Sequence, residues 1–98
     1  MTINKISEGS RLTIVIEGRL DTNSSPKLEA ELRQSVSGVT ELVFDFSGVE
    51  YISSAGLRVL LAAQKVMNRQ GSMRLVGVSA EVMEVFEITG FADILTIG

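Results

Sequence analysis

The run ELVFDF at residues 41–46 constrains the fold more than any other feature of this 98-residue chain. It is apolar on both faces of a pleated strand except at Asp45, and strands of that kind are buried on both sides. We therefore expect it to form the central strand of a sheet. Helical patterns precede and follow it, and such alternation calls for right-handed crossovers and an α/β fold with a parallel core, covered by helices.

The residues before this strand predict a hairpin followed by a helix. Leu12, Ile14 and Ile16 have the period-two spacing of a strand, which can pair with residues 2–7 across a turn at 8–10. The helix is expected from about Pro26 to Val36, with Ser25 as its N-cap, Pro26 at its first position, and one apolar face formed by Leu28, Leu32 and Val36.

The residues after the central strand predict two more helices and two more strands. A helix of about four turns begins near Ala55 and ends at Gly71, with Arg58, Lys65 and Arg69 along its polar stripe. The remaining segments are a strand at 73–78, a helix capped by Ser79 and stopped by Gly90, and a last short strand at 94–97. The predicted order is ββαβαβαβ, in a single domain spanning residues 1–98 with helices packed on a mixed sheet.

Composition excludes several classes of function. Nine Lys and Arg against twelve Asp and Glu give a formal net charge of -3, and the basic residues are scattered, so we expect no direct nucleic-acid partner. Because the chain has no Cys and no His, it lacks disulfides, thiolate nucleophiles, imidazole bases and the usual zinc sites. We therefore expect no catalytic residue, no metal and no cofactor, and so a protein that is not an enzyme.

Hydropathy predicts a cytoplasmic protein without membrane contact. The longest apolar run, Val59 to Ala63, is far shorter than the roughly 20 residues that span a bilayer. The segment MTINKISEGS lacks the apolar core of a signal peptide.

The stretch EYISSAGLRVLL at residues 50–61 places two serines, Ser53 and Ser54, where a helix begins. One serine there is most often an N-cap. Capping needs only one serine, and the small residues Ala55 and Gly56 leave the helix end open to another protein. The spacing does not give G-x-S-x-G and no histidine can serve as base, so one serine is more plausibly a substrate than a nucleophile.

These residues resemble the STAS domain of bacterial anti-sigma factor antagonists. The most specific part is a strand ending in Asp-x-Ser, a short loop, and Ser-small-Gly-Leu opening a helix; the Gly-x-Leu-Asp piece at residues 18–21 supports it. In that family the serine two places before the glycine of the motif is phosphorylated, which is Ser54 in this chain. This sequence departs from the family at Ser53, where many members carry aspartate.

The resemblance implies a partner switch that regulates transcription. The unmodified protein would bind an anti-sigma factor that is also a serine kinase, and so free the sigma factor; phosphorylation at Ser54 would release the kinase. ATP would be bound by the partner, and a phosphatase is a further possible partner. The alternative is a STAS scaffold, a transport or signalling complex subunit without a phosphoswitch.

The loop after the second strand is expected to border Ser54, because loops at the same end of a parallel sheet converge. Its polar residues Asp21, Thr22 and Asn23 are equally typical of simple turn chemistry. Arg58 lies one turn from Ser54, and we expect it at the partner surface although such charges more often form a solvated face. The expected partner-binding residues are Asp21, Thr22, Asn23, Ser53, Ser54, Ala55, Gly56 and Arg58.

Overall fold

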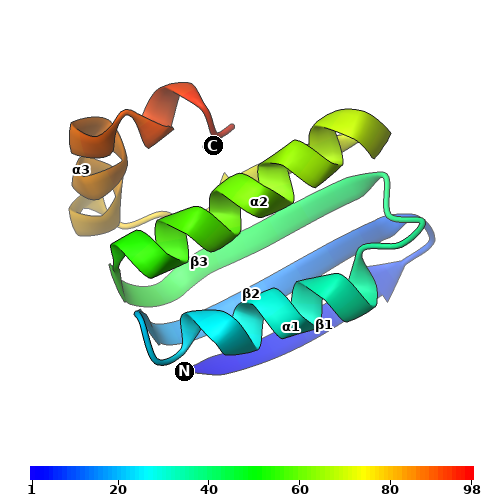
Figure 1. Ribbon diagram of the computed structural model, residues 1–98, viewed down its shortest axis with the longest axis horizontal. Coiled ribbons are helices and arrows are strands. Elements are labelled where there is room, and N and C mark those ends of the chain that lie inside the picture. The colour runs from blue at the N-terminus through cyan, green and yellow to red at the C-terminus, as the bar shows by residue number, and fades with distance from the viewer.

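The computed structural model describes all 98 residues, which form a four-stranded sheet and three α-helices (Figure 1). The strands are β1 (Thr2–Glu8), β2 (Arg11–Leu20), β3 (Glu41–Ile52) and β4 (Ser72–Val76). The helices are α1 (Ser25–Ser35), α2 (Ser54–Gln70) and α3 (Ala80–Thr89), followed by a short 3-10 helix, η1 (Phe91–Asp93).

The sheet is mixed with a parallel core, as the sequence predicts. Its strand order is β1-β2-β3-β4. β1 and β2 form the antiparallel hairpin, whereas β2 pairs with β3 and β3 with β4 in parallel. Because β3 has a hydrogen-bonded neighbour on each side, its prediction as a central strand is confirmed.

β3 is longer than the sequence predicts. It continues past residue 46 to Ile52, so Ser47 lies within the strand and no loop separates the strand from the start of α2 except Ser53. The register of β2 against β3 shifts between Val15 and Glu17 and again between Gly18 and Arg19. Such bulges let a long strand bend while it stays paired, which a pattern of apolar residues does not reveal.

The hydrophobic core lies on one face of the sheet. α1 and α2 lie side by side over that face, and α3 lies at one end of it (Figure 1). Phe44 and Phe46 of β3 point into this core, where Phe46 lies 6.3 Å from Phe86 of α3 between ring centroids. Val43, on the opposite face of the pleat, is buried but stands outside the core cluster.

The predicted last strand is reduced to a single bridge. Only Ile97 pairs with β4, through Leu75. The residues before Ile97 belong to η1 and to the turn that follows it, so they do not pair with β4. In that turn the N–H of Leu95 donates to the carbonyl of Phe91 at 2.9 Å. The observed order is therefore ββαβαβα with a short C-terminal bridge.

Candidate functional site

The two serines at the start of α2 have different surroundings. Ser53 has an extended backbone and is the N-cap, and its side-chain oxygen accepts a hydrogen bond from the N–H of Gly56 at 3.4 Å. The N–H of Ser53 donates to the carbonyl of Leu20 at 2.9 Å, which ties the start of α2 to the end of β2. Ser53 is half-buried and has a structural task.

Ser54 is the first residue of α2 and is exposed. Its hydroxyl makes no hydrogen bond to any other group of the chain. The helix therefore does not depend on the Ser54 hydroxyl, which remains free to react or to contact another molecule.

Gly56 belongs to the packing of α2 and not to the surface. It is buried, and a Cβ atom at this position would lie 2.8 Å from Cγ1 of Ile52 and 2.9 Å from Cγ of Leu20. The absence of a side chain lets α2 approach the ends of β2 and β3 closely. The neighbouring strands cover Gly56, and its contact with a partner stays a prediction.

Asp21 organises the loop between β2 and α1. Its Oδ1 accepts hydrogen bonds from the backbone N–H groups of Asn23 and Ser24, both at 3.0 Å, and from the Ser24 hydroxyl at 3.1 Å. The pKa of Asp21 lies below its ordinary value, mainly because the Ser24 N–H donates to its carboxylate. The Ser24 hydroxyl, the Asn23 N–H and Arg19 lower the pKa further, whereas desolvation opposes the shift. The half-buried Asp21 thus shows the turn chemistry that the sequence left as an alternative.

The same loop explains why α1 begins one residue earlier than predicted. Ser24, not Ser25, is the residue before the helix, and its hydroxyl donates to the carbonyl of Arg19 at 2.7 Å instead of capping α1. Ser25 is buried inside the first turn, and its hydroxyl donates to the carbonyl of Asp21 at 2.5 Å.

Two hollows lie beside the loop between β2 and α1. The first has a volume of about 230 Å³ and lies between α1 and α2, where Thr22, Ala55 and Arg58 meet. Arg58 is exposed and forms no ion pair within the protein. The second hollow, of about 530 Å³, is lined by Asp21 and Asn23. The predicted loop residues thus divide between two neighbouring hollows.

The Asp45 side chain accepts hydrogen bonds from its own strand. Its Oδ1 accepts hydrogen bonds from the N–H of Ser47 at 2.9 Å and from the Ser47 hydroxyl at 2.6 Å, and the hydroxyl bond is the main reason that its pKa is lowered. A Cβ atom at Gly77, which follows β4 with φ +69°, would collide with the Ser47 hydroxyl. Asp45 therefore stabilises β3 at its first register shift against β2, as a carboxylate that satisfies a backbone donor.

One contact near the site has no signal in the sequence. The guanidinium carbon of Arg19 lies 4.3 Å from the centre of the Tyr51 ring, a cation–π distance. Arg19 and Tyr51 face each other only because of the second register shift between β2 and β3. A pattern read along each strand separately does not reveal this pairing.

The protein has neither a metal-binding cluster nor a membrane-spanning helix. The protein has no group of three or more acidic side chains arranged to hold a metal ion. None of its helices is both long enough and apolar enough to cross a membrane.

Comparison with known proteins identifies the family. The family model described as the STAS domain matches residues 2–98. The chain belongs to the STAS domain family. This STAS domain is 38% identical over 99 residues to BtrV of Bordetella bronchiseptica, named as a candidate anti-sigma factor antagonist, with 99% of the chain and 84% of BtrV covered. It is 33% identical over 96 residues to the anti-sigma-B factor antagonist of Listeria monocytogenes, with 95% and 83% covered.

Solved structures agree with the fold. The anti-sigma factor antagonist SpoIIAA in its unphosphorylated form superposes with a TM-score of 0.78 at 17% identity, covering 99% of this chain and 87% of SpoIIAA. Its phosphorylated form gives a TM-score of 0.77 at 17% identity, covering 99% and 91%. The architecture of this STAS domain is therefore that of SpoIIAA.

Proposed function

We propose that this STAS domain is an anti-sigma factor antagonist that binds an anti-sigma factor serine kinase and is released when the kinase phosphorylates Ser54. Binding would free the sigma factor, and release would let the anti-sigma factor recapture it. The observation that carries the proposal is the exposed Ser54 hydroxyl, unused by the fold and directly beside a serine that already caps α2. The names of the relatives BtrV and the Listeria protein support the partner class.

Charge explains why phosphorylation would act on binding and not on folding. A phosphoserine carries roughly -1.5 to -2 charges near neutrality, and at a helix N-terminus the dipole interaction is favourable by about 0.3 to 1 kcal/mol. Burying the same dianion in an interface without a matched cation costs several kcal/mol. The modified protein would therefore stay folded and leave its partner.

The partner surface we propose has its centre at Ser54. Thr22, Ala55 and Arg58 border the hollow beside it, while Asp21 and Asn23 line the second hollow, on the same loop as Thr22. Arg58 is the residue we expect to contact an acidic group of the kinase, because it is exposed and has no ion-pair partner in the free protein. Ser53 and Asp21 would act by holding the backbone of this surface in shape.

Phosphorylation is tested with the cognate kinase and ATP, followed by intact-mass measurement and phosphopeptide sequencing. We expect one phosphate on the wild type, none on Ser54→Ala, and one on the matched control Ser53→Ala. Label on Ser53 in the Ser54→Ala variant at the wild-type rate would contradict the assignment of Ser54.

Binding is tested by calorimetric titration of the kinase with Ser54→Glu and with the uncharged control Ser54→Gln. Because a buried charge costs several kcal/mol, we expect Ser54→Glu to bind at least about tenfold more weakly than Ser54→Gln. Equal affinities would contradict the charge mechanism. Arg58→Ala should weaken binding severalfold at unchanged stability, and Arg58→Glu should weaken it further.

A further inference from the structure

The charged residues of α2 are all basic, and those of α3 are all acidic. Residues 51–76 contain four basic residues and no acidic one, whereas residues 77–98 contain four acidic residues and no basic one. The ion pairs of the protein join residues of β1, β2, β3, β4, α1 and the loop before α1, and none involves a charged residue of α2 or α3. Two helices therefore carry unpaired charge of opposite sign.

The basic stripe of α2 consists of Arg58, Lys65 and Arg69. All three are exposed, and their spacing of seven and four residues puts them on one side of the helix. The acidic stripe of α3 consists of Glu81 and Glu84, and it ends at Ile88, which shares that side of α3 at a spacing of three and four residues. Ile88 is 77% exposed, the most exposed large apolar side chain of the protein.

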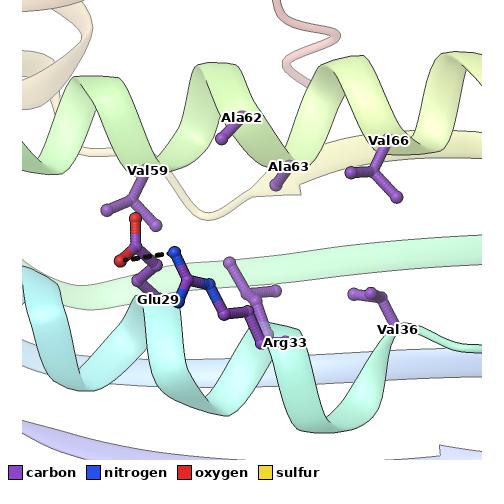
Figure 2. Close-up of a pocket in the computed structure, with 8 residues that line it drawn as sticks. Glu29, Arg33, Val36, Val59, Ala62, Ala63 and Val66 are labelled. Carbon is purple, nitrogen blue, oxygen red and sulfur yellow. Dashed lines mark ion pairs between the residues drawn. The ribbon is translucent and has the colours of Figure 1, made fainter.

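An apolar groove runs beside the basic stripe. It has a volume of about 170 Å³ and lies between α1 and α2, where Val59, Ala63 and Val66 face Val36 (Figure 2). Val66, between Lys65 and Arg69 in the sequence, is 39% exposed. On the α1 side the rim is neutral, because Glu29 and Arg33 form an ion pair at 3.3 Å. The charge beside the groove is therefore positive and comes from α2.

We propose that the groove between α1 and α2 binds α3 of a second copy of this protein, with Ile88 inserted between the helices and Glu81 and Glu84 against the basic stripe. The chain carries both halves of such a contact: an exposed apolar side chain flanked by unpaired acids, and an apolar groove flanked by unpaired cations. α3 cannot reach its own groove, because Val82 and Phe86 anchor it in the core at the end of the sheet.

The contact joins two different surfaces, so each bound copy still has one free groove and one free α3. Association of this kind does not stop at a dimer unless the copies close into a ring. It depends on unpaired surface charges, and is therefore weak and sensitive to salt. This self-association does not involve the Ser54 hydroxyl and goes beyond the function proposed above.

Sedimentation velocity over a range of concentrations tests the proposal. We expect the wild type to associate progressively in about 0.1 M salt and to weaken at least about tenfold in about 1 M salt, where the screening length falls from about 10 Å to about 3 Å. Ile88→Asp removes the apolar contact of α3, and Ala62→Glu places an acid in the groove at an exposed position. Each variant alone should be monomeric.

Mixing the two variants is the decisive experiment. Ile88→Asp retains an intact groove and Ala62→Glu an intact α3, so an equimolar mixture should form one-to-one dimers and nothing larger. Ile6→Asp is the matched control, because Ile6 is an exposed isoleucine of β1 outside both surfaces, and it should associate like the wild type. Circular dichroism verifies that each variant is folded. If Ala62→Glu does not fold, Lys65→Glu takes its place. A monomeric wild type, a monomeric mixture, or loss of association in Ile6→Asp would each overturn the proposal.

Discussion

A single glycine decides how closely α2 approaches the sheet. Glycine inside a helix is unfavourable by about 1 kcal/mol relative to alanine, so propensity alone favours replacing Gly56. Its surroundings oppose this, because the added Cβ would lie 3.0 Å from the carbonyl oxygen of Leu20 and nearer still to the side chains of Leu20 and Ile52. Packing and propensity thus make opposite predictions at one residue.

Gly56→Ala should lower the free energy of unfolding by about 1 to 3 kcal/mol, because overpacking at a fixed backbone exceeds the gain in helix propensity. Urea unfolding at neutral pH measures the change. Ser54→Ala, two residues away on an exposed position, is the control and should change stability by less than about 0.5 kcal/mol. A Gly56→Ala variant more stable than the wild type would show that α2 can move away from Leu20.

Asp45 should contribute stability that depends on pH. Hydrogen bonds from Ser47 lower its folded pKa below the ordinary 3.8, so the contribution is present above that value and lost as the pH falls through the folded pKa. Asp45→Asn should therefore cost about 1 kcal/mol at pH 7 and progressively less at acidic pH. Unfolding in urea at several pH values measures this difference. As a second check, Ser47→Ala should raise the Asp45 pKa in an NMR titration. If Asp45→Asn lowered the free energy of unfolding by the same amount at every pH, the carboxylate charge would not be the cause.

The helix ends show how far local sequence determines an element. Ser79 caps α3 by accepting a hydrogen bond from the Val82 N–H at 3.2 Å, and Gly90 ends the helix at φ +82°, both as predicted. Each of these signals is local, since a cap needs only its own turn. At Ser25 the same reasoning is one residue wrong, because the Arg19 carbonyl and the Asp21 carboxylate of the preceding segment engage the Ser24 hydroxyl.

The strands show the limit of local patterns more clearly. The alternation in β2 and the apolar run in β3 predict where the strands lie, but not the two register shifts between them. Register depends on which pairing buries the most apolar surface, and that is a property of two strands together. For the same reason the pairing of Arg19 with Tyr51 could not be predicted, whereas the Ser53 and Ser54 motif, which is contiguous, could be recognised.

Capping should make Ser53 and Ser79 measurable contributors to their helices. Ser53→Ala and Ser79→Ala should each lower the free energy of unfolding by about 0.5 to 1 kcal/mol, because each leaves one backbone N–H without its acceptor. Ser53→Asp should retain stability, since aspartate is an equally good N-cap. Thermal and urea unfolding measure both. If Ser53→Ala were neutral while Ser54→Ala were destabilising, the roles of the two serines would have to be exchanged.

At the scale of the whole molecule, the core depends on the last residues of the chain. α1 and α2 cover one face of the sheet and α3 lies at one end of it (Figure 1), while the C-terminal segment runs along the free edge of β4, where Ile97 bridges to Leu75. Leu95 is 6% exposed and belongs to the core cluster. The N–H of Gly98 donates to the carbonyl of Leu75 at 3.0 Å, and the N–H of Leu75 donates to that of Thr96 at 2.9 Å. These bonds hold the segment against β4 although no regular strand forms.

Leu95→Ala should therefore destabilise the whole domain, and not only its end. Truncating a buried leucine lowers the free energy of unfolding by about 2 to 5 kcal/mol. We expect a value at the lower end for Leu95→Ala, because a segment at the chain end can move into the space that the side chain leaves. The neighbouring Ile94 is 47% exposed and gives a matched control of the same size, for which Ile94→Ala should cost less than about 1 kcal/mol. Urea unfolding followed by circular dichroism measures both, and hydrogen exchange within β3 reports whether the sheet loses protection together with the C-terminal segment. A Leu95→Ala variant with wild-type stability and only local loss of protection at residues 94–98 would mean that the C-terminal segment rests on a core that is complete without it.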